Sequence, residues 1–130
     1  MKKKWVLAIA VVVVLIVIWF SVAPPRFILN LSKKVAATPG CGARLVQDYG
    51  CRQCHQIGGR GALVAPKLDG ITQRVDDPAR VTLRLWLRNP KAVKPATAMP
   101  NFHLSDYEID AIIAYLEALD RGEAIPPGGC

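Results

Sequence analysis

The chain has 130 residues, of which 52% are hydrophobic, and this length bounds its folded part to one small domain. It is too short for a doubly wound nucleotide-binding fold or a barrel enzyme. The formal net charge of +7 is unevenly placed, because residues 1–40 hold six basic residues and no acidic one. Eleven basic and ten acidic residues remain in 41–130, and this near-neutral balance excludes a nucleic-acid-binding composition.

The charges within the folded part are also segregated along the chain. Residues 44–94 hold ten basic and four acidic side chains, whereas residues 106–123 hold one basic and six acidic side chains. This pattern predicts a domain with a basic side and an acidic side, which would orient a partner.

Residues 1–23 are predicted to form a transmembrane anchor. Three lysines come first, and the stretch from Trp5 to Pro25 then contains no charged residue, with tryptophans near both ends that suit the membrane interfaces. A cleaved signal peptide with a small-residue site at Ser21–Ala23 is the alternative. The length of the apolar run, and the proline that follows that site, favour the anchor.

Residues 24–40 are predicted to be a linker between this anchor and a folded domain at 41–130. Two prolines end the apolar run, and a Thr-Pro-Gly turn precedes the domain. Four apolar side chains of the linker are expected either along the membrane surface or against a neighbouring subunit. These four are Phe27, Ile28, Leu29 and Leu31.

The strongest chemical signal is the pentapeptide Cys51-Arg-Gln-Cys54-His55. On a helical turn, residues three apart share a face, so both thiols can reach the two vinyl groups along one haem edge while the next residue lies beneath the iron. The pattern therefore predicts a c-type haem attachment site with His55 as an axial ligand.

Three other interpretations of the pentapeptide stay open. A thioredoxin-like redox pair requires a βαβ context that the sequence does not indicate. A structural zinc site could assemble Cys41, Cys51, Cys54 and His103, although no second close-spaced pair is present. A plain disulfide between Cys51 and Cys54 would leave His55 without a role.

The second axial ligand is predicted to be Met99. Apart from the residue that starts the chain it is the only methionine, and it lies in the segment Thr97–Phe102, where Pro100 stiffens the backbone. The alternatives are Met99 as a gap-filler in the core and His103 as the ligand in its place.

Two helices are predicted in the rest of the domain. The first spans residues 79–88 and is preceded by Asp77 as the N-cap and by Pro78 at the N1 position. The second opens with a capping box formed by Ser105 and Glu108 and continues with apolar residues at helical spacing. These apolar residues are Ile109, Ile112, Ile113, Leu116 and Leu119.

Together these segments resemble the class I mono-haem cytochromes c of bacteria over residues 42–119. Residues 42–46 are similar to the start of the family's N-terminal helix, although a valine stands where an aromatic residue is common. Residues 65–68 resemble the loop in which a proline carbonyl, here that of Pro66, accepts a hydrogen bond from the proximal imidazole. The segment around Met99 matches the family's distal loop.

The resemblance implies an all-α fold, with a small helical domain around one covalently bound haem c after the single transmembrane helix. The last helix is expected to cross the first helix of the domain. A disulfide between Cys41 and Cys130 is then sterically plausible, and the sequence leaves it open. Because haem c is attached on the translocated side, the domain is expected on the extracytoplasmic, periplasmic side of the cell membrane.

Iron held by His55 and Met99 has no open position, which favours single-electron transfer over enzymatic bond chemistry. The expected function is that of a membrane-anchored carrier in a respiratory or photosynthetic chain, as a subunit of a quinol-oxidising or related membrane complex. The alternatives are a tethered free-standing shuttle and a haem peroxidase or gas sensor. Arg52 and Arg60 are expected to border the exposed haem edge and to face redox partners with acidic docking surfaces.

Overall fold

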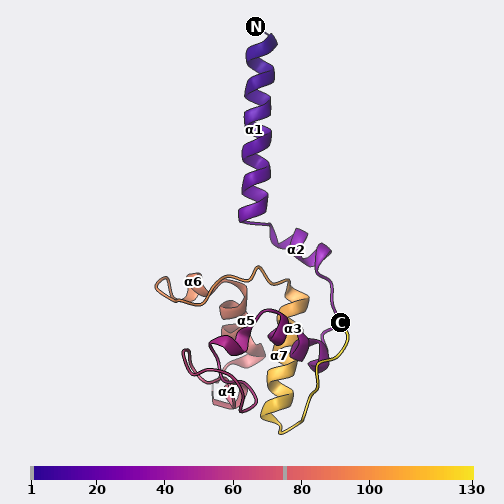
Figure 1. Cartoon of the computed structure of the whole chain (residues 1–130), viewed down its shortest axis with the longest axis vertical. Helices are drawn as coiled ribbons and strands as arrows, with labels where there is room; N and C mark the ends of the chain where they lie inside the picture. Colours follow the sequence, from indigo (N-terminus) through magenta and orange to yellow (C-terminus); the bar gives the residue numbers. More distant parts are fainter. Residues whose placement is uncertain (1, 75) are drawn as a thin grey trace.

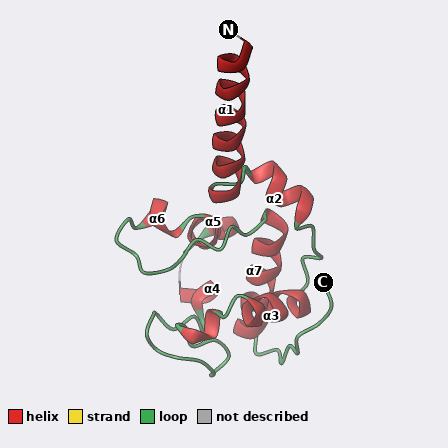
Figure 2. Cartoon of the chain, turned by 45° about the horizontal axis from the view of Figure 1, so that its top comes forward, coloured by secondary structure: helices red, strands yellow, loops and turns green. Residues whose placement is uncertain are grey.

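Helices make up the regular structure of the computed structural model, which describes residues 2–74 and 76–130 (Figures 1 and 2). In chain order the elements are α1 (Lys2–Val22), α2 (Arg26–Ser32), α3 (Pro39–Asp48), the 3-10 turn η1 (Cys51–Gln53), α4 (Ile71–Arg74), the 3-10 turn η2 (Pro78–Arg80), α5 (Val81–Arg88), α6 (Pro90–Val93) and α7 (Asp106–Asp120). Apart from an isolated bridge between Ile57 and Arg60, the described part of the chain contains no strand. The predicted all-α class is confirmed.

The core forms where α3 crosses α7, two helices that lie side by side in both views (Figures 1 and 2). Gly42 of α3 allows this crossing, because a Cβ atom on it would lie 2.0 Å from the carbonyl oxygen of Ala111 and 2.7 Å from the Cβ of Tyr115. The two backbones therefore approach closely and bury the apolar faces of both helices. The buried apolar side chains of α3 and α7 are Cys41, Ala43, Leu45, Val46, Ile109, Ala111, Ile112, Ile113, Tyr115, Leu116 and Ala118.

The start of α7 is fixed by side chains that satisfy its free backbone donors. The hydroxyl of Ser105 accepts a hydrogen bond from the backbone N–H of Glu108 at 3.1 Å. The carboxylate of Glu108 accepts one from the backbone N–H of Ser105 at 2.8 Å. This reciprocal pair is a capping box, and the sequence prediction of it is confirmed.

Helix α5 starts at Val81, two residues later than the sequence pattern predicted. The two residues before it have φ values of 54° and 57°, a left-handed conformation that an α-helix cannot contain. Asp77 nevertheless caps this helix, because its carboxylate accepts hydrogen bonds from the N–H groups of Thr82 (2.9 Å) and Leu83 (3.1 Å). Burial raises the pKa of Asp77, but these backbone hydrogen bonds outweigh it and hold the pKa below its ordinary value.

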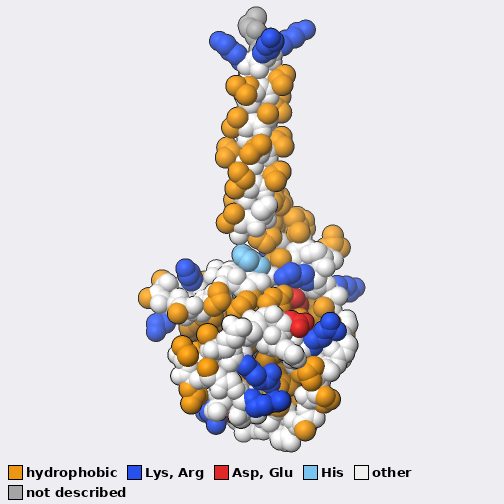
Figure 3. All heavy atoms as spheres, viewed as in Figure 1, with side chains coloured by type: hydrophobic (Ala, Val, Ile, Leu, Met, Phe, Trp, Pro, Cys, Tyr) orange, Lys and Arg blue, Asp and Glu red, His pale blue; other side chains and the backbone are white. Residues whose placement is uncertain are grey.

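Helix α1 is apolar from Trp5 onward. An 18-residue stretch of this helix has a mean hydropathy of 3.0, and none of that stretch is buried within the chain. Figure 3 shows hydrophobic side chains along its sides and lysines at its free end. Its length and composition allow it to cross a membrane, and a signal sequence near the N-terminus has the same properties.

The segment predicted as a linker contains α2, which is docked on the helical domain. Arg26 donates a hydrogen bond to the carbonyl of Leu104 at 2.8 Å and pairs with the carboxylate of Asp106. One turn later, Asn30 donates to the same carboxylate at 2.7 Å and accepts from the backbone N–H of Asp106 at 2.8 Å. Leu29 is only 6% exposed. Leu29 therefore lies against this chain's own domain. Its two predicted locations, the membrane surface and a neighbouring subunit, are both wrong.

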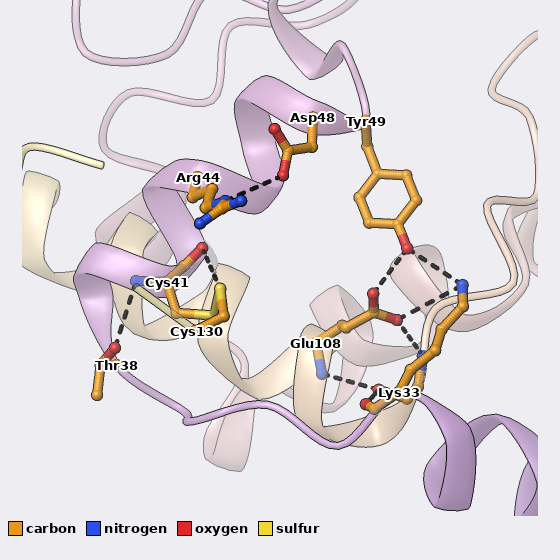
Figure 4. Close-up of a disulfide and its surroundings, with 9 residues drawn as sticks. Lys33, Thr38, Cys41, Arg44, Asp48, Tyr49, Glu108 and Cys130 are labelled. Carbon is orange, nitrogen blue, oxygen red and sulfur yellow. Dashed lines mark hydrogen bonds and ion pairs between the residues drawn. A yellow bond between two sulfur atoms is a disulfide. The ribbon is translucent and has the colours of Figure 1, made fainter. Parts of the chain in front are cut away.

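A disulfide joins Cys41, in the first turn of α3, to Cys130 at the end of the chain (Figure 4). The side-chain oxygen of Thr38 accepts a hydrogen bond from the backbone N–H of Cys41 at 3.3 Å and so caps α3. The C-terminal tail returns to this helix start, where the N–H of Gly128 donates to the carbonyl of Gly40 at 2.8 Å. The bridge that the sequence left open is formed, and it links positions 89 residues apart.

The basic and acidic segments of the domain lie against each other. Three arginines of η2 and α5 each meet a carboxylate of α7, in the ion pairs Arg80–Glu117, Arg84–Asp110 and Arg88–Asp106. The prediction of a basic side and an acidic side is therefore wrong for this part of the surface, because these charges neutralise each other where α5 packs on α7.

Candidate haem-attachment site

The two cysteines of the pentapeptide follow directly from the end of α3. Gly50 has a φ of +66°, which ends the helix and starts the 3-10 turn that carries both thiols. The N–H of His55 donates to the carbonyl of Cys51 at 3.0 Å, so the pentapeptide closes one helical turn. Both cysteines are free thiols, with Cys51 half-buried and Cys54 exposed. Burial is the main cause that raises the pKa of the Cys51 thiol.

The imidazole of His55 is held from one side. Its Nδ1 atom lies 2.7 Å from the carbonyl oxygen of Pro66. This is the hydrogen bond between imidazole and proline carbonyl that the family resemblance implied. A carbonyl can only accept, so Nδ1 carries the proton of this pair and Nε2 keeps its lone pair. The ring orientation and the free nitrogen are what an axial ligand of haem iron requires.

The loop that returns the chain to Pro66 is tied to the pentapeptide by backbone hydrogen bonds. The N–H of Ala62 donates to the carbonyl of Arg52 at 3.0 Å, and the N–H of Ala65 donates to that of Cys54 at 2.9 Å. Gly61 has a φ of +110°, and a Cβ atom on it would lie 2.3 Å from the carbonyl oxygen of His55. Only glycine allows the loop to fold this closely over the pentapeptide.

Arg52 has an internal role that sequence reasoning missed. Its guanidinium donates to the hydroxyl of Tyr115 at 2.6 Å and to the carbonyl of Ile57 at 3.2 Å. The side chain therefore anchors the attachment turn to α7. Arg52 is half-buried and Arg60 is exposed, and the prediction that they face an acidic partner stays a prediction.

The segment around Met99 is organised by its own short polar side chains. The N–H of Met99 donates to the hydroxyl of Thr97 at 3.2 Å, and the N–H of His103 donates to the side-chain oxygen of Asn101 at 2.9 Å. Met99 is half-buried. These contacts explain the loop conformation, and the role of Met99 as an iron ligand stays a prediction.

A polar cluster of Lys33, Tyr49 and Glu108 joins the linker to the attachment segment (Figure 4). The hydroxyl of Tyr49 donates to the buried carboxylate of Glu108 at 2.7 Å. Burial first, and then the hydrogen bond to Glu108 and its charge, raise the pKa of Tyr49 well above its ordinary value. The capping box identified Glu108, but no sequence signal indicated that Lys33 would reach it.

The residues at this site fit a covalently attached haem and fit the other interpretations poorly. Two free thiols and an imidazole with an available Nε2 are the donor set that haem c requires. The four-ligand zinc site is contradicted, because Cys41 is bonded to Cys130. No group of three or more His, Cys, Asp or Glu side chains that could hold a metal ion occurs among residues 2–74 and 76–130. A Cys51–Cys54 disulfide is likewise not formed.

Comparison with known proteins agrees with this chemistry. A cytochrome c oxidase subunit 2 from Alkalihalophilus pseudofirmus is 27% identical over 84 residues, which cover 60% of this chain and 25% of that protein. The C subunit of a nitric oxide reductase from Halomonas halodenitrificans is 29% identical over 108 residues, covering 78% of this chain and 69% of the relative. The corresponding nitric oxide reductase protein from Paracoccus denitrificans is 33% identical over 81 residues, covering 58% and 54%.

The chain thus spans between a quarter and about two thirds of the length of these relatives. Residues 41–120 match the family described as Cytochrome c, which agrees with the stretch that carried the sequence resemblance. This match covers more than half of the chain. The chain therefore belongs to the cytochrome c family, whose members carry covalent haem c and transport electrons.

Proposed function

We propose that this chain is a membrane-anchored cytochrome with one haem c, in which Cys51 and Cys54 form the thioethers and His55 and Met99 are the axial ligands. The observation that carries the proposal is the hydrogen bond between His55 and Pro66 beside two free thiols. It supports the ligand role of His55, because a ring fixed at Nδ1 can offer Nε2 to iron.

When bound, haem c supplies reversible one-electron exchange between ferric and ferrous iron. The residues of this chain decide which other chemistry is possible. If His55 and Met99 both held the iron, no coordination position would be left for a substrate. A methionine ligand also favours a higher potential than a second histidine. This ligand set therefore supports electron transfer without bond chemistry.

The relatives favour one kind of complex as the site of this electron transfer. Their names describe subunits of nitric oxide reductase and of cytochrome c oxidase. We infer that the chain delivers electrons into a reductase or oxidase, rather than serving the quinol-oxidising complex expected from the sequence. The reduction of the substrate would then take place in another subunit.

The docked α2 supports a fixed relay over a tethered shuttle. A free shuttle needs a flexible linker that lets the domain swing. Here Arg26 and Asn30 bind Asp106 at the start of α7, and Lys33 binds Tyr49. These contacts leave few residues free to move between α1 and the domain.

The proposed topology is a single span by α1 with the domain on the extracytoplasmic side. The Cys41–Cys130 bridge supports this side, since disulfides persist in oxidising compartments. On that side the exposed basic side chains of Arg60, Lys91 and Lys94 are the candidates that meet an acidic docking surface. A mature protein that retains residues 2–22 and resists extraction from membranes at high pH would support the anchor over a cleaved signal.

The central test uses the full chain purified in detergent. We expect an intact mass that includes one haem after denaturation, and a ferrous form that does not bind carbon monoxide. Met99→Ala should bind carbon monoxide and have a lower potential, whereas the matched variant His103→Ala should change neither property. Protein without added haem mass would contradict the proposal. Rapid carbon monoxide binding by the wild type would instead support a peroxidase or gas sensor.

A further inference from the structure

Helix α2 presents two rows of side chains that have different surroundings. Arg26 and Asn30 are four residues apart and share the face that binds Asp106. Phe27 and Leu31 are also four residues apart, and they are 68% and 83% exposed. The helix therefore has one face docked on the domain and one exposed apolar row.

The length of α1 indicates where this apolar row lies relative to a bilayer. Its uncharged part, residues 5–22, extends about 27 Å at about 1.5 Å per residue, which is close to the thickness of a hydrocarbon core of about 30 Å. Three residues separate Val22 from Arg26, and a connection that short spans at most about 14 Å. A helix held this close to the end of the span lies at the membrane surface.

The apolar row is also continuous with the surface of α1. Trp19, Phe20 and Val22 are exposed at the end of that helix, and Phe27 and Leu31 follow on α2. Figure 3 shows hydrophobic side chains gathered over α2 beside the end of α1. Lipid alone therefore suffices to cover the end of α1 and the exposed row of α2. A partner subunit that covered this row would have to insert between α2 and the bilayer.

We propose that α2 is seated in the lipid–water interface, with Phe27 and Leu31 inserted among the lipids while Arg26 and Asn30 hold the domain. This inference rests on the proposed membrane anchor. It assigns α2 the function of an amphipathic adapter, because one face binds lipid and the other binds protein. The domain is then held in one orientation at the membrane rather than tethered at a variable angle.

The test is the reactivity of single introduced cysteines in the full holoprotein. In that form the thioethers and the disulfide leave no other free thiol, so an added cysteine is labelled alone. Phe27→Cys and Leu31→Cys are compared with Val12→Cys in α1 and with Gln73→Cys in α4, which lies far from α1 in Figure 1. Each variant is placed in phosphatidylcholine nanodiscs without any other protein and treated with a charged, water-soluble maleimide.

We expect Phe27→Cys and Leu31→Cys to react at least 10-fold more slowly than Gln73→Cys, since lipid excludes the reagent and disfavours the thiolate. Reaction of both as fast as Gln73→Cys, with Val12→Cys still protected, would overturn the lipid seat and leave the anchor standing. Reaction of Val12→Cys as well would overturn the anchor and the seat together. The haem spectrum must first show that each variant is folded. Two positions are used so that the test still stands when one of the two variants fails to fold.

Discussion

The side-chain ammonium of Lys33, in the segment between α2 and α3, lies 3.1 Å from the hydroxyl of Tyr49. The same ammonium donates to the carbonyl of His103 at 3.1 Å and lies 3.8 Å from the carboxylate of Glu108. One residue of the linker therefore contacts both the segment that leads into the attachment turn and the segment that follows the predicted methionine ligand.

Removing this ammonium is expected to destabilise the domain. Lys33→Met leaves the buried carboxylate of Glu108 without this cation, although Tyr49 and Ser105 still donate to it. Loss of a charged partner of this kind costs about 1–3 kcal/mol. Because Lys33 is about one third exposed, we expect the lower half of that range. Denaturant unfolding of the holoprotein in detergent measures the loss. The control is Lys34→Met, whose ammonium lies over the ring of Tyr107, and equal losses in both variants would contradict the prediction.

Adding one methyl group at the helix crossing is expected to separate α3 from α7. In Gly42→Ala the new Cβ meets the Ala111 carbonyl oxygen at 2.0 Å, and overpacking of this kind costs about 1–3 kcal/mol or more. A loss of this size lowers the thermal midpoint of a small domain by about 4 °C or more. Gly129→Ala is the matched control, because its Cβ would meet nothing within 4 Å. Similar midpoints for both variants would show that the crossing is looser than described.

The close approach of Gly61 to the attachment turn predicts a defect in haem loading. Gly61→Ala combines a φ of +110° with a contact of 2.3 Å to the carbonyl oxygen of His55, so the loop must move away from the pentapeptide. We expect a lower ratio of covalent haem to protein. Gly59→Ala separates the two causes, because it also has a positive φ but open space around its Cβ. Equal ratios of covalent haem to protein in the two variants would show that the positive φ alone causes the defect.

The start of α7 is expected to make the domain sensitive to acid. Burial raises the pKa of Asp106, but the hydrogen bonds from Asn30, Arg88 and Arg26 and the charge of Arg26 outweigh it and hold the pKa far below the ordinary value of 3.8. A carboxylate with a lowered folded pKa stabilises the fold above about pH 4, and that contribution is lost as the pH falls toward the folded pKa.

Asp106→Asn should therefore be less stable than the wild type at neutral pH and should lose less stability on acidification. Denaturant unfolding measured from about pH 7 down to about pH 2.5 tests this, with the two curves converging at the acid end. Parallel curves would mean that Asp106 does not supply the acid dependence.

The bridge between Cys41 and Cys130 is expected to stabilise the fold without affecting the haem. The double variant Cys41→Ser, Cys130→Ser should lose about 2–4 kcal/mol, because the unfolded chain regains the freedom of a long loop. The visible spectrum should stay unchanged, because neither residue belongs to the attachment turn. Reductant should lower the stability of the wild type to that of the variant, and no response to reductant would contradict the bridge.

Several features could be predicted because their cause lies within a few residues of sequence. The Ser105–Glu108 capping box needs two side chains three positions apart, and the pentapeptide carries its own thiols and imidazole. The apolar helix α1 likewise follows from composition alone. The start of α5 could not be predicted in this way. The Asp77 carboxylate accepts a hydrogen bond from the N–H of Thr82, five residues later, and two residues between them have the left-handed conformation.

The sequence by itself determined the helical class and the family, and it supplied the pentapeptide that we propose as the attachment site, because local patterns carry each of them. Only the tertiary structure decided that Arg26 binds Asp106, 80 positions away, that Cys41 meets Cys130, and that the arginines of α5 neutralise α7. These contacts join segments that lie far apart in the chain and that the packed fold, including the close crossing of α3 and α7 at Gly42, brings together. No local pattern specifies which distant side chain a folded backbone will bring within reach.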